Sequence, residues 1–140
     1  MIEFFIDCIP PKTTAQSATR IFKNKKTGSM FIGKIDKGIA TRNELMWLLA
    51  PHRPDHPFDK ALKLTIKWQY PFRKNETKKN IKKGIVWCDK RSDCDNLAKF
   101  FLDCMTRCRF FTDDAIVAIL HFEKFYCLKS GIYVKIEEIL

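Results

Sequence analysis

The clearest pattern in the chain is an alternation of apolar and polar residues over 61–70. In the sequence ALKLTIKWQY, leucine, isoleucine and tryptophan alternate with lysine, threonine and glutamine. Apolar residues at every second position lie on one face of a strand, so this segment is predicted to be a half-buried β-strand. The apolar and aromatic opening at 2–9, which stops at two prolines, predicts another strand.

Two segments have the periodicity of helices. Over 41–50, apolar residues follow helical spacing, Thr41 is placed to cap the start, and Glu44 is placed to complete a capping box. Pro51 is expected to end this helix. Over 95–107, leucine, phenylalanine and cysteine recur at helical spacing, and an aspartate just before or at the start can cap the helix.

The remaining segments complete an α+β pattern. Residues 12–37 are expected to form a loop or a hairpin. Residues 115–126 and 132–139, with a Ser-Gly pair between them, are expected to form a β-hairpin. We therefore predict a single compact domain over 1–140, with a mixed β-sheet and helices packed on one face.

The charge of the chain is large and unevenly distributed. Its 140 residues carry a formal net charge of +10. Residues 1–86 hold 18 basic and 7 acidic side chains, whereas residues 87–140 hold 8 basic and 9 acidic. The surplus favours a polyanionic partner, either nucleic acid or an anionic membrane surface. An apolar content of 46% excludes a disordered tail.

Basic side chains are densest in a segment expected to be a mobile loop, at about 71–90. Within it, residues 73–84 hold five lysines and one arginine against one glutamate. Such a run is usually a solvated loop, but lysines that contact phosphates often lie on loops that order on binding. The candidates for contact with DNA phosphates are Arg73, Lys74, Lys78, Lys79, Lys82, Lys83 and Arg91.

The cysteines and the start of the chain indicate a compartment. The six cysteines form no CxxC pair, and the histidines at 52 and 56 are not placed to complete a zinc site. Buried free thiols in a reducing cytosol are expected. The start lacks the features of a signal peptide, and no stretch approaches the roughly 20 apolar residues of a membrane span. We expect a cytoplasmic protein with no membrane partner.

Two pairs of acidic residues bracket the second predicted helix. Asp93 and Asp95 precede it, and Asp113 and Asp114 follow it. A helix of about 13 residues is about 20 Å long, so the pairs cannot meet directly. They meet only if the following strand runs back to place Asp114 beside the helix start, or if helix starts from two subunits face one another.

Three such carboxylates in a basic protein suit Mg²⁺ or Mn²⁺ better than zinc. A cation held in this way can polarise a phosphodiester and generate hydroxide near neutral pH. Lys99, four residues after Asp95, is placed to meet charge that develops on the phosphate. Aspartates are also common caps and turn residues, and Lys99 is placed to pair with Asp95. Spacing alone therefore favours a metal nuclease only modestly.

The acidic residues lie within a longer pattern that resembles a known family. The run RSDCDNLAK at 91–99, then FLD at 101–103 and FTDDA at 111–115, resembles the RusA family of Holliday-junction resolvases. The run IPPKTTAQ at 9–16 is similar to the N-terminal strand and turn of that family. The resemblance is dense over 91–126 and keeps the same order over most of the chain.

The resemblance implies a RusA-like fold and assigns roles to the acidic residues. It implies that Asp93, Asp95 and Asp114 are catalytic metal ligands, that Lys99 is the catalytic lysine, and that Asp113 is a further candidate ligand. It also implies a homodimer that uses Mg²⁺, with Mn²⁺ as a substitute, to cut opposed strands of a four-way junction in DNA recombination and repair. Members of the family are frequently encoded by phages.

The leading hypothesis is therefore a metal-dependent endodeoxyribonuclease that resolves branched DNA. The alternative is a non-catalytic nucleic-acid-binding module in which the acids only cap and turn. In that case Trp68, Tyr70 and Phe72 would stack on bases, unless they pack in the core. A zinc-stabilised interaction protein built on the cysteines is a third hypothesis. Incubating a four-way junction with and without Mg²⁺ distinguishes the first two.

Overall fold

The computed structural model describes residues 1–12, 17–36, 38–90 and 92–140. Two 3₁₀ turns, η1 and η2, accompany its helices and strands. The elements follow in the order β1 (Ile2–Ile6), β2 (Ser17–Lys23), β3 (Met30–Asp36), α1 (Ile39–Leu49), η1 (Ala50–His52), β4 (Leu62–Pro71), α2 (Lys78–Lys82), β5 (Ile85–Trp87), α3 (Cys94–Arg107), η2 (Asp114–Ile116), β6 (Val117–Cys127) and β7 (Gly131–Glu138). This order confirms the predicted α+β class.

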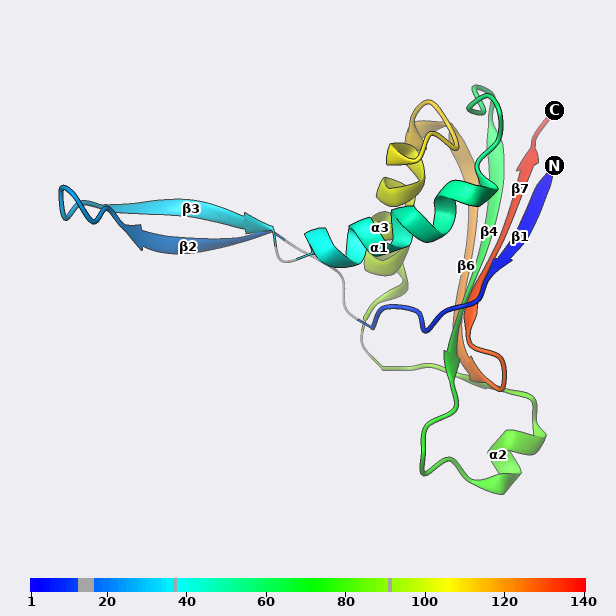
Figure 1. Cartoon of the computed structure of the whole chain (residues 1–140). Helices are drawn as coiled ribbons and strands as arrows, with labels where there is room; N and C mark the ends of the chain where they lie inside the picture. Colours follow the sequence, from blue (N-terminus) through cyan, green and yellow to red (C-terminus); the bar gives the residue numbers. More distant parts are fainter. Residues whose placement is uncertain (13–16, 37, 91) are drawn as a thin grey trace.

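The strands form a mixed sheet whose centre is β4. Within the described residues, five strands follow the order β1-β7-β4-β6-β5, and β2 and β3 form a separate hairpin. β4 pairs antiparallel with β7 and parallel with β6. Figure 1 shows α1 and α3 on one face of the sheet, with the β2–β3 hairpin extending away from them. The predicted layering of helices on one face is confirmed.

The central strand β4 also forms the spine of the core, as its alternation predicts. Trp68 packs edge-on against Phe101 of α3, with ring centroids 5.4 Å apart. The indole Nε1 of Trp68 and the hydroxyl of Tyr70 both donate to the carbonyl oxygen of Pro11, at 3.0 and 3.2 Å. Both aromatic residues are buried, so they are not the exposed stacking groups that a nucleic-acid-binding module would need. The buried residues of β4 are Leu62, Leu64, Ile66, Trp68 and Tyr70.

The last two strands do not form the β-hairpin that their short connection predicts. Only residues 128–130 join β6 to β7, yet β4 lies between the two strands. Gln69 of β4 is opposite Phe125 of β6 on one side and Gly131 of β7 on the other. A short link usually joins neighbouring strands. Here each strand instead pairs with β4, whose apolar face contributes five buried residues to the core.

The two remaining differences lie in local structure. α1 begins at Ile39 with Gly38 as its N-cap, rather than at Thr41, because the carbonyl oxygen of Gly38 already accepts a hydrogen bond from Arg42 N–H. The segment expected to be a loop at 71–90 contains α2 and β5. Its helix forms because Thr77 Oγ1 accepts a hydrogen bond from Asn80 N–H at 3.2 Å. The mobility of this segment stays a prediction.

Four of the six cysteines are buried, as expected for free thiols: Cys88, Cys104, Cys108 and Cys127. Burial raises the pKa of Cys104 to about 12, so its thiol stays protonated and unreactive at neutral pH. In the part of the chain that the structure describes, no helix combines the length and apolar character needed to cross a membrane.

Gly131 lies at a close approach between β7 and β1, which gives a stability prediction. A Cβ atom at this position would lie 2.4 Å from the carbonyl oxygen of Ile6 and 2.3 Å from the ring of Phe5. Gly131→Ala should lower the free energy of unfolding, measured in urea, by about 3 kcal/mol because the backbone must shift. Gly84→Ala is the control, since Gly84 has a φ of +85° but an added Cβ atom there would meet no other atom within 4 Å. Its loss should be about 1 kcal/mol, and equal losses would contradict the close approach.

Candidate active site

Asp93 and Asp95 lie at the start of α3 with exposed side chains. Asp93 occupies the N-cap position, but its side chain makes no capping hydrogen bond. Asp95 lies in the first turn of the helix, where the helix dipole favours a negative charge. The proposal that Asp93 serves only as a cap therefore does not describe this structure. Both carboxylates are free to bind a ligand.

A lysine on β6 holds the segment that precedes Asp93. Lys124 Nζ donates to the carbonyl oxygens of Ser92, at 2.6 Å, and of Lys90. The hydroxyl of Ser92 in turn donates to the carbonyl oxygen of Lys12 at 2.8 Å. Hydrogen bonds from a charged donor each contribute about 1.5–3 kcal/mol, so these contacts fix the entry to α3. Sequence analysis missed Lys124, whose only signal is a lysine within an apolar strand.

Asp113 and Asp114 lie after the other end of α3. Asp113 Oδ1 accepts the N–H of Ala115 at 2.9 Å, and this hydrogen bond holds the pKa of Asp113 below its ordinary value. The hydrogen bond with Asp113 raises the pKa of Asp114, and burial and the negative charges of Asp113 and Asp103 raise it further. A bound cation would offset this negative charge and favour the ionised form of Asp114.

The two acidic pairs do not meet within one chain. The 14 residues of α3 span about 20 Å. The helix crosses from the end of β4 to the start of β6, so the end of the helix, not its start, is followed by Asp114 (Figure 1). Among the described residues, no three Asp, Glu, His or Cys side chains are grouped closely enough to hold a metal ion.

The first of the two arrangements predicted for the acids is therefore wrong for a single chain. Strand β6 does run back along α3, but it brings Lys124, not Asp114, to the segment at the helix start. The physical reason is direction, because β6 starts where the helix ends. The second arrangement, in which two subunits supply the acids, stays a prediction.

Lys99 and Asp103 differ in their partners. Lys99 is exposed, and no carboxylate of the described residues lies within 4 Å of its ammonium group, so it does not form the expected ion pair with Asp95. Asp103 Oδ2 lies 3.1 Å from Nε of both Arg42 and Arg107. The charge of Asp103 is thus engaged in structural ion pairs, whereas Lys99 is available to an anion.

The predicted DNA-contacting residues other than Arg91 lie on α2 or close to it in the chain, beyond the end of β4 (Figure 1). Arg73 differs from the rest, because its Nη2 lies 3.1 Å from Glu76 Oε2 and its guanidinium group lies over the ring of Tyr126. Arg73 therefore orders the segment, while Arg91 lies outside the described residues. The others are exposed and have no ion pair in the described parts of the chain: Lys74, Lys78, Lys79, Lys82 and Lys83.

Exposed carboxylates that could hold a divalent cation, and exposed lysines without an ion pair among the described residues, suit a protein that acts on nucleic acid. Sequence comparison identifies the family. The model of the endodeoxyribonuclease RusA family matches residues 9–137, so the chain belongs to this family. A relative from Lactococcus phage r1t, the crossover junction endodeoxyribonuclease rusA, is 27% identical over 139 residues, which cover 98% of this chain and 96% of the relative. The predicted resemblance and the endodeoxyribonuclease class are confirmed.

Lys124→Met tests whether Lys124 positions Asp93. The variant keeps a long apolar stem but loses the ammonium group that donates to two carbonyl oxygens. Exchange of the amide hydrogens of Cys88 and Leu97, which donate to the carbonyl oxygens of Lys124 and Asp93, should become about tenfold faster. If Asp93 is a metal ligand, DNA cleavage should also fall about tenfold, because Asp93 is no longer held. The exposed Lys63 on β4 provides the control, and Lys63→Met should change neither measurement. Unchanged exchange in Lys124→Met would show that the segment is held by other contacts.

Proposed function

We propose that the protein is a divalent-metal-dependent endonuclease that resolves four-way DNA junctions by paired, symmetric cuts. Its family supplies the endodeoxyribonuclease class, and the phage relative is named for crossover junctions. The observation that supports metal-dependent chemistry is that the carboxylates of Asp93, Asp95 and Asp114 have no basic partner among the described residues.

The donor set fits a hard divalent cation. Asp93, Asp95 and Asp114 would hold Mg²⁺ through carboxylate oxygens, and Mn²⁺ would substitute. When bound, the cation would polarise the scissile phosphodiester and lower the pKa of water toward neutrality. Asp113 is a further candidate ligand, although its hydrogen bond to Ala115 N–H also suits it to orient Asp114. The free ammonium group of Lys99 would stabilise the negative charge that develops on the phosphate.

The separation of the acids supports a site built by two subunits. A two-fold homodimer would form two equal sites, each with Asp93 and Asp95 from one subunit and Asp114 of the partner subunit. Such a dimer would also hold two active sites at a fixed distance. A four-way junction, whose strands are opposed in pairs, would then be selected by its shape.

The open edge of β6 supports a specific form of this dimer. β5 pairs with residues 125–127 of β6, and the carbonyl oxygen of Lys124 accepts a hydrogen bond from Cys88 N–H. Within the described chain, residues 117–123 therefore have β4 on one side and no backbone partner on the other. Ile119 and Leu120 on this stretch are 48% and 43% exposed. Strand edges with unpaired backbone groups readily pair with another chain. Antiparallel pairing of two β6 strands about Leu120 would place Val117 opposite the partner subunit's Glu123, one residue from Lys124. Because Lys124 holds the segment before Asp93, the two acidic groups would meet there.

Basic residues on α2 would supply contacts to the DNA backbone. The exposed lysines of the segment would neutralise phosphates without reading sequence, so affinity should fall steeply as salt rises. Preference for a junction would then come from geometry rather than from contacts with bases.

Asp95→Asn tests the metal-dependent cleavage. The variant keeps the shape of the side chain but loses a charged ligand. Cleavage of a labelled four-way junction with Mg²⁺ should fall by about a thousandfold, while junction binding stays within about twofold. In the wild type, EDTA should abolish cleavage, and mapping should show one cut in each of two opposed strands.

Asp89→Asn is the matched control, because Asp89 is an exposed aspartate 3.7 Å from Lys90 Nζ and close in sequence. It should cut at the wild-type rate. Cleavage by Asp95→Asn at that rate would overturn the role of Asp95. Binding by the wild type without any metal-dependent cut would favour the non-catalytic binding module.

A further inference from the structure

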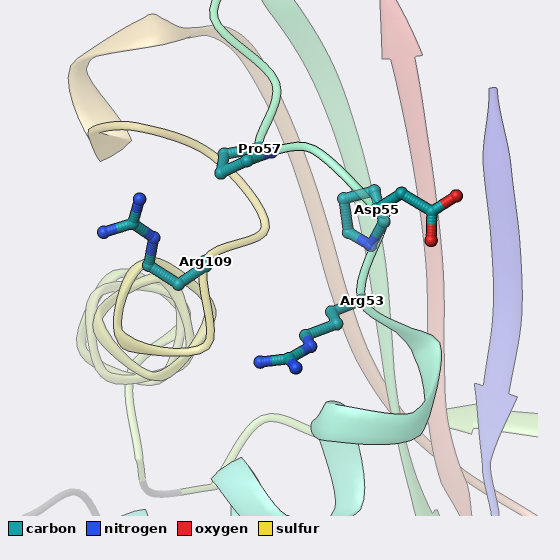
Figure 2. A pocket seen from close by; sticks show the side chains of 5 residues that line it. Arg53, Asp55, Pro57 and Arg109 are labelled. Atoms are coloured by element: carbon teal, nitrogen blue, oxygen red, sulfur yellow. The ribbon is translucent and has the colours of Figure 1, made fainter.

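Two arginines that sequence analysis did not single out line a pocket near the end of α3. The pocket has a volume of about 340 Å³ and is lined by Arg53, Pro54, Asp55, Pro57 and Arg109. Figure 2 shows that the guanidinium groups of Arg53 and Arg109 lie on the same side of the loop, while the carboxylate of Asp55 points away from them. The charged groups that face the pocket are therefore positive.

The walls of this pocket are held by backbone pairing between two segments that are distant in sequence. Phe58 N–H donates to the carbonyl oxygen of Phe110 at 2.9 Å, and Thr112 N–H donates to the carbonyl oxygen of Phe58 at 3.0 Å. Phe110 and Phe111 are buried in the core. The loop that carries Arg53 is thus fixed beside the segment that carries Arg109.

The backbone of Arg109 does not explain why an arginine is present. Its φ is +68°, a left-handed conformation that costs a non-glycine residue roughly 1–2 kcal/mol. Glycine is the usual residue at this position after a helix. An arginine at this position bears this strain, so its presence is better explained by a role of its side chain than by its backbone.

Neither guanidinium group forms an ion pair with a carboxylate that the structure describes. Arg42, Arg73 and Arg107 each form an ion pair at 3.1 Å. By contrast, no carboxylate among the side chains that the structure describes lies within 4 Å of Arg53 or Arg109. Unpaired guanidinium groups that line a common pocket can bind the oxygens of a phosphate.

We propose that Arg53 and Arg109 bind a backbone phosphate of the DNA strand that passes the cleavage site. This proposal rests on the proposed function and adds a binding site to it. The pocket is close to Asp114, because Arg109 is five residues before it in the chain. Thr112, which lies between them, donates its N–H to the carbonyl oxygen of Phe58 in the other wall of the pocket. In a dimer formed through β6, this end of the molecule would face the start of α3 and the lysines of α2 in the other subunit. The two arginines would therefore hold DNA on the opposite side of the scissile phosphate from those lysines.

The double variant Arg53→Ala/Arg109→Gly tests the site. Glycine removes the side chain of Arg109 and also relieves its left-handed backbone, so the fold should stay stable in urea. Binding of a fluorescent four-way junction is measured in EDTA at increasing KCl, so that no cleavage occurs. We expect at least about a tenfold loss of affinity, and a salt slope smaller by about one, as for the loss of one phosphate contact. Arg53→Lys/Arg109→Lys, which keeps the charge, should recover part of the affinity.

Lys63→Ala/Lys135→Ala is the charge control, because it removes two positive charges at positions that alternate with the buried residues of β4 and β7. Lys135 Nζ lies 3.4 Å from Glu137 Oε1, whereas Lys63 has no ion pair among the described side chains. The affinity of this control should change by less than about threefold. If the arginine variant loses no more affinity than this control, the proposal that the pocket binds a phosphate is overturned. Wild-type cleavage with Mg²⁺, measured in parallel, separates the two proposals. If the wild type does not cut but the arginine variant still binds weakly, only the nuclease function fails. If the wild type cuts and the arginine variant binds like the control, only the pocket fails.

Discussion

The length of α3 is the constraint on which the rest of the account depends. Its 14 residues span about 20 Å, with Asp93 and Asp95 at its start and Asp114 after its end. The helix cannot bend or shorten to bring these acids together, because its apolar face is packed on β4, with Phe101 against Trp68. Any such movement would open the core. On the proposed function, a metal site that uses all three acids would therefore be completed by another chain.

Strand β6 runs between the two acidic groups. It begins just after Asp114, and Lys124 near its other end holds the segment before Asp93. Its open edge offers a pairing surface on which a two-fold operation would exchange these ends between subunits. The same operation would bring the unpaired arginines at one end of α3 toward the lysines around α2. Basic side chains from both subunits would then lie around each cleavage site.

Local patterns predicted much of this fold, and contacts between distant segments explain the rest. The alternation in β4 and the periodicity of α3 are set by neighbouring residues, so both were predicted well. The pairing of β6 and β7 with β4 was missed, because a short link between strands says nothing about a third strand inserted between them. α2 was missed because a five-residue helix in a lysine-rich run has almost no periodic signal. The acids were proposed as ligands from spacing and resemblance. Their placement depends on the direction of β6, and the Arg53–Arg109 pocket depends on long-range backbone pairing.

Mixed dimers test the central claim, that two subunits complete each site, most directly. Asp95→Asn and Asp114→Asn subunits, carrying different tags, are co-expressed and the doubly tagged dimer is purified. If each site takes Asp95 from one subunit and Asp114 of the partner subunit, this dimer has one intact site and one site with both changes. It should nick one strand of a four-way junction with Mg²⁺, although neither variant alone does so. If the acids of each site came from one subunit, both sites would carry a change, and absence of nicking by the purified mixed dimer would contradict the account.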